Sequence, residues 1–394
     1  MNTEKSLLII NGGSSSIRFA FYRVAEAAFT LLLKGKLYNI GNNTTEPVLT
    51  TNTSEKPQNL RVRENTFEHA ARFLVEWLEN QQEFPQVSTV GHRIVHGMEQ
   101  TEPQEITPEL LAYLKTISPY DPEHLPEEIK LIELFSQRHP ALKQIACFDT
   151  AFHSNMPAVA KRLAIPRRFS EKGLHRYGFH GISYAYLMQE LERLAGKEVA
   201  SGKVILAHLG NGASVAAVKE GRCLDTSMGF TPASGLMMGT RSGDIDPGIA
   251  SYMIQFEKLS AKKFNHLVNH ESGLIGVSET SSDMQELMQL QTTDHRAEEA
   301  IALFCYQIKK HIGSFAAVLG GVNNLVFSGG IGENIPHIRS EICKDLSFLG
   351  IGLDEERNRK NEAIISDIAD KVTVRVIATN EELMIARLVS QVLN

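Results

Sequence analysis

The chain has 394 residues, a length that suits two domains better than one compact core. Its composition is ordinary for a globular protein, and its formal net charge of -6 gives no reason to expect nucleic acid or an anionic membrane as a partner. The four cysteines form no CxxC pair, which argues against a cysteine-based zinc site or a disulfide framework. The apolar run near the N-terminus is too short for a signal peptide or a membrane span, so we expect a cytoplasmic protein.

The N-terminal segment predicts a β-hairpin around a glycine- and serine-rich turn. An apolar run covers Leu7 to Asn11, Gly-Gly-Ser-Ser-Ser follows, and a second apolar run covers Ile17 to Val24. Thr30 to Ile40 is expected to supply a third strand. Residues 41–64, rich in Asn, Thr, Ser, Glu and Pro, are expected to form a solvated excursion.

Two segments have the spacing of amphipathic helices. Apolar residues recur every three or four positions over Phe67–Trp77 and over Ala297–Leu319. Packing against a sheet is a sufficient explanation for both patterns.

The strand–turn–strand plan of the N-terminus recurs about 200 residues later, close to half the length of the chain. The second copy reads VILAHLGNGASVAAV from Val204, and a third glycine-rich turn, SGGIGEN, follows the apolar residues Asn324–Phe327 and leads into an expected helix. This spacing predicts a duplicated α/β domain with a nucleotide held between the two halves.

The glycine-rich turns are candidate phosphate-binding sites. Backbone N–H groups approach phosphate oxygens closely only where side chains are small, a condition that residues 11–16 and 329–334 meet. The chain has no Walker A sequence and no convincing Rossmann fingerprint. One such turn alone is more often a plain hairpin, but three of them at strand ends favour phosphate binding.

Arg93 lies in the segment GHRIVHG, whose two histidines are four positions apart, as in a zinc-binding helix. Such a helix has its catalytic general base where this segment has Arg, so the segment favours a strand. On a strand, Arg93 and Val95 share one face. A guanidinium beside a small apolar group suits a small carboxylic acid, although a structural ion pair is the commoner role for a lone arginine.

Three further residues have both a functional and a structural interpretation. Arg241 lies in the turn GTRSGDIDPG, where it either reaches a charged intermediate or pairs locally with an aspartate. Asp149 follows an apolar stretch and is expected near the carboxyl end of a strand, where α/β sheets place ligand contacts, or as a helix cap. His180 is flanked by glycines, which argues against a packed helix at this point.

Taken together, these segments resemble the acetate kinase family, within the superfamily of sugar kinases, heat-shock chaperone ATPases and actin. The resemblance runs nearly from end to end. It is carried in family order by INGGSSSIRF, GHRIVHG, CFDTAFHSNMP, HRYGFHGISY, HLGNGAS, DTSMGFTPASGLMMGTRSGDIDP, SGGIGEN and ATNEELMIAR.

The resemblance implies an α/β protein with duplicated ribonuclease H-like (actin-like ATPase) domains and a nucleotide cleft between them. The N-terminal domain would comprise residues 1–150 plus 382–394, and the C-terminal domain residues 151–381. The implied reaction is reversible, direct in-line transfer of phosphate from ATP to acetate, with Mg2+ (or Mn2+ in its place) as cofactor, in a cytoplasmic homodimer. Propionate or another short acid is the alternative substrate, and a non-catalytic nucleotide-dependent binding protein is the alternative class.

The resemblance also implies roles for individual residues. The catalytic set comprises Asp149, Arg93, Arg241 and His180, and the acyl group would meet Arg93, Val95, Phe179 and Pro232. The nucleotide and its phosphates would meet Ser14, Ser16, Arg18, His208, Asn211, Gly212, Asp283, Gly330, Ile331 and Asn334, while Asn11 and Glu381 would help to hold magnesium.

A carboxylate is already ionised at pH 7, so the reaction needs cations around the transferring phosphoryl group more than it needs a general base. Three positions depart from the family pattern. Glu123 stands where an aliphatic residue usually walls the acyl pocket, Met98 where the family usually has Gly, and Gln285 where an Arg commonly lies near the adenine. The first two bear on the preferred acid, and the third on the preferred nucleotide.

Overall fold

The computed structural model describes residues 5–13, 15–25, 28–41, 46–52, 58–62, 65–367 and 369–393. The chain forms two compact units, the first comprising Met1–Ala151 with Asn380–Asn394 and the second Phe152–Thr379. The sequence predicts domain boundaries at 150/151 and 381/382, and the two compact units divide at 151/152 and 379/380.

The first unit is built on an eight-stranded mixed sheet of order β5-β4-β3-β2-β1-β6-β8-β7. The first three strands form an antiparallel meander, whereas β6 is parallel to β1 and β8 is parallel to β6. The strands are β1 (Lys5–Gly12), β2 (Ser16–Ala25), β3 (Ala28–Tyr38), β4 (Val48–Asn52), β5 (Gln58–Arg61), β6 (Val87–Ile94), β7 (Gln104–Glu105) and β8 (Lys143–Phe148).

The expected solvated excursion over 41–64 is wrong for two stretches, because β4 and β5 extend the sheet there. Leu49 and Val62 are buried, so the segment has a core-facing side that its polar composition concealed. Residues 42–45, 53–57 and 63–64 lie outside the described part of the chain.

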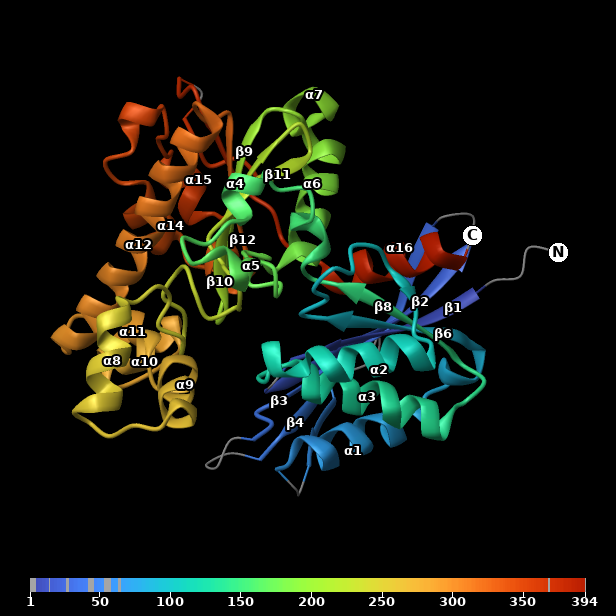
Figure 1. Cartoon of the computed structure of the whole chain (residues 1–394). Coiled ribbons are helices and arrows are strands. Elements are labelled where there is room, and N and C mark those ends of the chain that lie inside the picture. Colours follow the sequence, from blue (N-terminus) through green and yellow to red (C-terminus); the bar gives the residue numbers. More distant parts are fainter. Residues whose placement is uncertain are drawn as a thin grey trace. The chain divides into compact units, whose positions relative to one another are not determined.

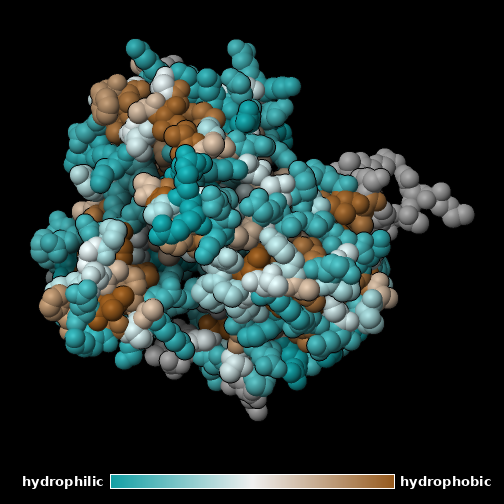
Figure 2. Space-filling model, viewed as in Figure 1, coloured by the Kyte–Doolittle hydropathy of each residue, from teal (hydrophilic) through white to brown (hydrophobic). Residues whose placement is uncertain are grey.

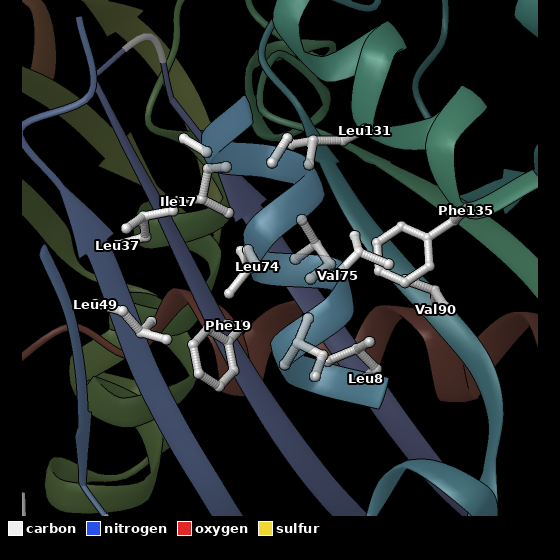
Figure 3. Close-up of a cluster of buried hydrophobic side chains, with 14 of the residues drawn as sticks. Leu8, Ile17, Phe19, Leu37, Leu49, Leu74, Val75, Val90, Leu131 and Phe135 are labelled. Atoms are coloured by element: carbon white, nitrogen blue, oxygen red, sulfur yellow. The ribbon is translucent and has the colours of Figure 1, made fainter. Parts of the chain in front are cut away.

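Helix α1 (Phe67–Glu79) confirms the predicted helix and covers one face of this sheet (Figure 3). Its first turn is capped by Thr66, whose hydroxyl accepts a hydrogen bond from the backbone N–H of His69. Leu74 and Val75 pack among Leu8, Phe19 and other buried strand residues. The remaining helices of the unit are α2 (Pro108–Ile117), α3 (Leu125–Arg138) and α16 (Glu381–Leu393).

Helix α16 approaches the sheet closely because residue 91 of β6 is glycine. A Cβ atom at Gly91 would lie 2.6 Å from Cγ2 of Val389 and 3.1 Å from Cγ2 of Ile385. This contact holds α16, whose first residue is Glu381, against the sheet of the first unit.

The second unit is built on a five-stranded sheet of order β11-β10-β9-β12-β13. Its strands are β9 (Lys203–Leu209), β10 (Ala213–Lys219), β11 (Arg222–Thr226), β12 (Asn324–Ser328) and β13 (Thr373–Val376). Its helices are α4 (Ala158–Lys161), α5 (Arg167–Ser170), α6 (Gly181–Ala195), α7 (Lys197–Ala200), α8 (Pro247–Gln255), α9 (Ala261–His270), α10 (Gly273–Ser278), α11 (Met284–Leu290), α12 (His295–Leu319), α13 (Gly329–Asn334), α14 (Pro336–Cys343) and α15 (Glu355–Arg359) (Figure 1).

The two sheets share one topology, which confirms the duplicated α/β fold. In each unit the first three strands form an antiparallel meander, and two further strands are added in parallel beside the first strand. The strands β3-β2-β1-β6-β8 of the first unit thus correspond to β11-β10-β9-β12-β13 of the second. The long helix expected over 297–319 is confirmed as α12.

Among the described residues, no helix is both long and apolar enough to cross a membrane. The face of the molecule seen in Figure 2 is mostly hydrophilic, with apolar residues in separate patches. All four cysteines are buried and free, and burial raises the pKa of each thiol.

Candidate active site

In the first unit, three predicted site residues lie at one edge of the sheet. The parallel strands β1, β6 and β8 end together at this edge, which carries Asn11, Arg93 and Asp149. Asp149 directly follows β8, and its backbone N–H donates to the carbonyl of Ile94 at the end of β6. The expected position of Asp149 at the carboxyl end of a strand is therefore correct.

Arg93 and Asp149 form a buried ion pair. Nη2 of Arg93 donates to Oδ2 of Asp149 at 2.6 Å, and the Asp149 side chain is fully buried. Burial by itself lowers the pKa of Arg93, but the carboxylates of Asp149, Glu381 and Glu128 outweigh it and raise the pKa above its usual value. Arg93 is thus held as a cation.

One donor of this guanidinium is left over. Among the described residues, Nε of Arg93 is buried and finds no hydrogen-bond partner. A buried donor without a partner costs free energy, about 1–3 kcal/mol, unless a ligand accepts from it.

Val95 does not share a strand face with Arg93 as predicted, because β6 ends at Ile94. Val95 is nevertheless buried, and its backbone N–H donates to both carboxylate oxygens of Glu128, each at 3.1 Å. Burial, and then the nearby Asp121, raises the pKa of Glu128 well above its usual value, against the opposing effect of Arg93. Glu128 cannot be recognised from the sequence, since a lone acid within a helix pattern carries no signal of its own.

Asn11 and Glu381 meet as expected, although they are 370 positions apart. Nδ2 of Asn11 donates to Oε2 of Glu381 at 2.8 Å and to Oε1 of Glu382 at 3.0 Å. An amide and two carboxylates are hard oxygen ligands of the kind that Mg2+ takes, with water and phosphate oxygens in its other positions. The described residues hold no cluster of three or more His, Cys, Asp and Glu side chains fit for a metal.

The first glycine-rich turn joins β1 to β2, and Ser14, assigned to it by resemblance, lies outside the described residues. The backbone N–H of Gly13 donates to the carbonyl of Ser16 and closes the turn. Arg18 is exposed on β2, opposite Asn11 on one side and Lys36 on the other. Burial and then the charge of Arg18 lower the pKa of Lys36.

In the second unit, His180 caps α6 in the left-handed conformation, with φ 58°. His180 is not itself within a helix, as the flanking glycines predicted. A packed helix, α6, begins at the next residue, Gly181. Nδ1 of His180 lies 2.8 Å from Oγ of Ser214, and its ring lies 4.6 Å from the ring of His208.

The second glycine-rich turn brings His180 and Arg241 together. A Cβ atom at Gly212 would lie 3.2 Å from Nε2 of His180 and 3.9 Å from Nη1 of Arg241. The turn also lies against the third glycine-rich segment, since a Cβ atom at Gly210 would be 3.9 Å from the backbone nitrogen of Gly330. The second turn therefore lies beside two basic side chains at Gly212 and beside the start of the third glycine-rich segment at Gly210.

Arg241 is held in its loop by nearby acceptors, because its Nη1 donates to the carbonyl of Pro232 at 3.1 Å. Pro232 and Phe179 are both buried. The carbonyl of Phe179 accepts from Nε2 of His153 at 2.9 Å, which fixes the backbone just before His180. The residues expected at the acyl group in this unit are thus near Arg241 and His180.

The third glycine-rich segment is not a turn, because helix α13 begins at Gly329 itself. Gly329 has φ 77°, and a Cβ there would lie 2.6 Å from the carbonyl oxygen of Leu209, so only glycine fits. Gly330 and Asn334 are exposed and joined by a hydrogen bond from Nδ2 of Asn334, whereas Ile331 is largely buried.

Two other expected nucleotide residues have visible structural roles. Asn211 is exposed at the tip of the second turn, and its carbonyl accepts from the N–H of Gly239. Asp283 caps α11 by accepting from the backbone N–H groups of Gln285 and Glu286. A helix cap explains Asp283 without a ligand.

The two sheets share one topology, and each has a glycine-rich turn after its first strand, so the chain is a duplicated α/β protein of the ribonuclease H-like fold class. Comparison with known proteins narrows this class. The model of the Acetokinase family matches residues 6–387, and the chain belongs to that family.

Individual relatives agree with this assignment. An acetate kinase of Rhodopseudomonas palustris (strain TIE-1) is 42% identical over 97% of this chain and 96% of its own length. The crystal structure of Porphyromonas gingivalis acetate kinase is 36% identical, with a TM-score of 0.87 over 99% of this chain and 100% of that one. A propionate kinase from Francisella tularensis subsp. tularensis SCHU S4 is 34% identical, with a TM-score of 0.90 over 98% of each chain.

Proposed function

We propose that the protein transfers the γ-phosphoryl group of ATP to acetate, giving ADP and acetyl phosphate, and that the reaction is reversible. The cation of Arg93, paired with Asp149 where β6 and β8 end, is the observation that carries this proposal, since a guanidinium fixed at this place can bind the carboxylate of the acid. A carboxylate oxygen forms the new bond to phosphorus while the bond from phosphorus to the bridging oxygen of ADP breaks. No proton has to move, because the acid is already ionised.

The proposed roles follow from the contacts within each unit. Arg93 binds the carboxylate of the acid, and Asp149 holds the guanidinium in place. Arg241 and His180, which flank Gly212, stabilise the negative charge that spreads over the phosphoryl oxygens. Both groups of residues would act on the same ATP and the same acid. We also propose residues 1–150 plus 382–394 and residues 151–381 as the two domains.

Asn11, Glu381 and Glu382 are the residues that would hold Mg2+. A bound magnesium ion supplies charge neutralisation to the phosphate oxygens of ATP. The amide of Asn11 must turn its oxygen toward the ion, and its Nδ2 remains available to a carboxylate oxygen.

Propionate is the second candidate acid, since one similar solved structure is that of a propionate kinase. Two departures from the family pattern bear on the choice. Glu123 is partly exposed in the segment before α3, and Met98 packs on the cluster formed by Ile94, Phe148 and their neighbours. Met98 therefore has a packing role. Glu123 is the other unusual residue, and its effect on the preference among acids is the one to test.

The decisive experiment measures hydroxamate formation from acetate, propionate and butyrate with MgATP, and repeats the panel with GTP and pyrophosphate. We expect the highest kcat/KM with acetate and ATP. A Glu123→Leu variant in the same panel shows whether that side chain reaches the acid. No turnover with any acid, or a phosphoprotein that passes its phosphate to acetate, would contradict direct transfer.

We also propose a cytoplasmic homodimer joined through α8. This helix has no buried residue, and it carries large apolar side chains on its surface. The exposed fractions of Ile249, Tyr252 and Ile254 are 41%, 55% and 45%, and that of Phe256, the C-cap residue directly after the helix, is 68%. Apolar exposure of this extent on one helix is typical of an interface.

A further inference from the structure

Glu128 is a buried acid to which the proposed reaction gives no role. It lies on α3 with an exposed fraction of 3%, and both of its carboxylate oxygens accept from the backbone N–H of Val95. Burial of a carboxyl group costs free energy of desolvation, and it is the main reason why the pKa of Glu128 is raised. A buried acid beside a candidate site is itself a candidate for a role in that site.

Helix α3 brings Glu128 to the ends of two strands that carry proposed site residues. Val95 directly follows β6 and lies two positions after Arg93. At the last residue of β1, Gly12, a Cβ atom would lie 4.0 Å from Cγ of Glu128 and 3.0 Å from Cδ1 of Leu131. The carboxyl group of Glu128 therefore lies at the same edge of the sheet as the proposed acid-binding cation.

Glu128 and Asp149 together fix the peptide group between Ile94 and Val95. The carbonyl of this peptide accepts from the backbone N–H of Asp149 at 2.8 Å, and its N–H donates to Glu128. The hydrogen-bond ladder of β6 ends here, where a buried backbone N–H still needs an acceptor. Glu128 supplies that acceptor, so the direction in which the chain leaves β6 depends on this side chain.

We propose that Glu128 is a positioning residue that sets the preference among short acids by holding Val95 in place. This inference rests on the proposed function, in which Arg93 binds the carboxylate of the acid and Val95 faces its alkyl group. A wall whose backbone is fixed at both polar atoms cannot retreat, and a close-packed site penalises one additional methylene. The bond of Arg93 with Asp149 does not involve Glu128, so the carboxylate should still bind when Val95 is released.

Two substitutions separate the acceptor of Glu128 from its charge. Glutamine and leucine both remove the charge and have nearly the size of glutamate, but only glutamine keeps an oxygen that can accept from Val95. Charge alone would therefore give the two variants the same behaviour, whereas positioning through the hydrogen bond gives them different behaviour.

The first test compares kcat/KM for acetate and for propionate with MgATP. In Glu128→Leu the ratio of acetate to propionate should fall by about tenfold, within the range for one methylene, while KM for ATP stays within about twofold. Glu128→Gln should keep the wild-type ratio. Glu127→Leu, at the preceding and partly exposed position of α3, is the control and should also keep it. An unchanged ratio in Glu128→Leu, or equal changes in the leucine and glutamine variants, would overturn the proposal.

The second test is independent of activity. In full-length protein labelled with 15N-valine, the amide signal of Val95 is assigned by its disappearance in Val95→Ile. Its hydrogen exchange should be at least about tenfold faster in Glu128→Leu than in the wild type and in Glu128→Gln, because one hydrogen bond is lost. Equal exchange rates in all three proteins would overturn the proposal, and Glu128→Ala replaces the leucine variant if that variant does not fold. Absence of turnover with every acid in the wild type would instead refute the proposed function, whatever the exchange rates.

Discussion

Nη2 of Arg93 and Oδ2 of Asp149 lie 2.6 Å apart, and the two residues come from the ends of the neighbouring parallel strands β6 and β8. Because these strands run side by side, the pair is set by the sheet and not by a loop. Asp149 occupies Nη2 of the guanidinium and leaves Nε for a ligand. A single ion pair therefore serves both stability and the proposed binding of the acid.

Replacing Arg93 by Gln should lower kcat/KM for acetate by about a hundredfold to a thousandfold, the usual cost of losing one preorganised donor to a reacting anion. It should also lower stability by about 3 kcal/mol, because Asp149 is left as a buried carboxylate without its cation. Activity and urea unfolding check the two effects separately. The double variant Arg93→Met with Asp149→Leu should recover stability but not activity, and recovery of both would contradict the catalytic role.

Replacing Glu381 by Gln should raise the Mg2+ concentration needed for half-maximal activity by at least about tenfold, because the variant loses a charged oxygen ligand. Titration of Mg2+ at saturating ATP measures the change. Glu382→Gln, on the other carboxylate bonded to Asn11, is the matched comparison and should show a similar shift. No shift in either variant would place the metal elsewhere.

Stability should depend on pH through His92. Burial lowers its pKa to about 4, even though the hydrogen bond with Gln144 opposes the change. The folded pKa is below the unfolded value of 6.5, so this contribution is complete above pH 6.5 and is lost as the pH falls toward 4. Between pH 8 and pH 5 the wild type should lose about 2 kcal/mol more than His92→Gln. Urea unfolding at both pH values measures the difference, and His337→Gln, on an exposed side chain, should behave as the wild type.

Met98 has φ 51°, a left-handed conformation that is unfavourable for a side chain and free for glycine. Met98→Ala keeps this strain and loses the packing of the methionine, whereas Met98→Gly loses the packing and relieves the strain. Met98→Gly should therefore be more stable than Met98→Ala by about 1 kcal/mol. Thermal unfolding compares the two variants, and a more stable alanine variant would show that the conformation is not strained.

The proposed interface on α8 predicts a change of oligomeric state. Tyr252→Glu combined with Phe256→Glu places two charges on the exposed apolar face and should convert a dimer into a monomer. Light scattering after size-exclusion chromatography measures the mass. A matched pair of charges at Val318 and Val392, which are exposed on other helices, should leave the wild-type mass unchanged.

The local patterns were sufficient to predict most elements that build the site. The hairpin at the N-terminus, its second copy, α1 and α12 all follow from apolar periodicity interrupted by glycine. The prediction of a solvated excursion was wrong for β4 and β5. These segments are mostly polar in composition, but one side of β4 is buried in the core. At Gly329 the predicted helix is present, but it begins within the glycine-rich run, where a turn was expected first.

The sequence by itself determined the family, the duplicated α/β plan and the kinds of residue available for phosphate chemistry, because these depend on motifs and their order. Only the tertiary structure decided which residues touch: that Asn11 meets Glu381 across 370 positions, that Glu128 holds Val95, and that Ser214 lies beside His180. Such contacts arise when strands far apart in the chain end at one edge of a sheet. Their hydrogen bonds and buried charges depend on distances of a few ångströms, which no spacing along the chain specifies.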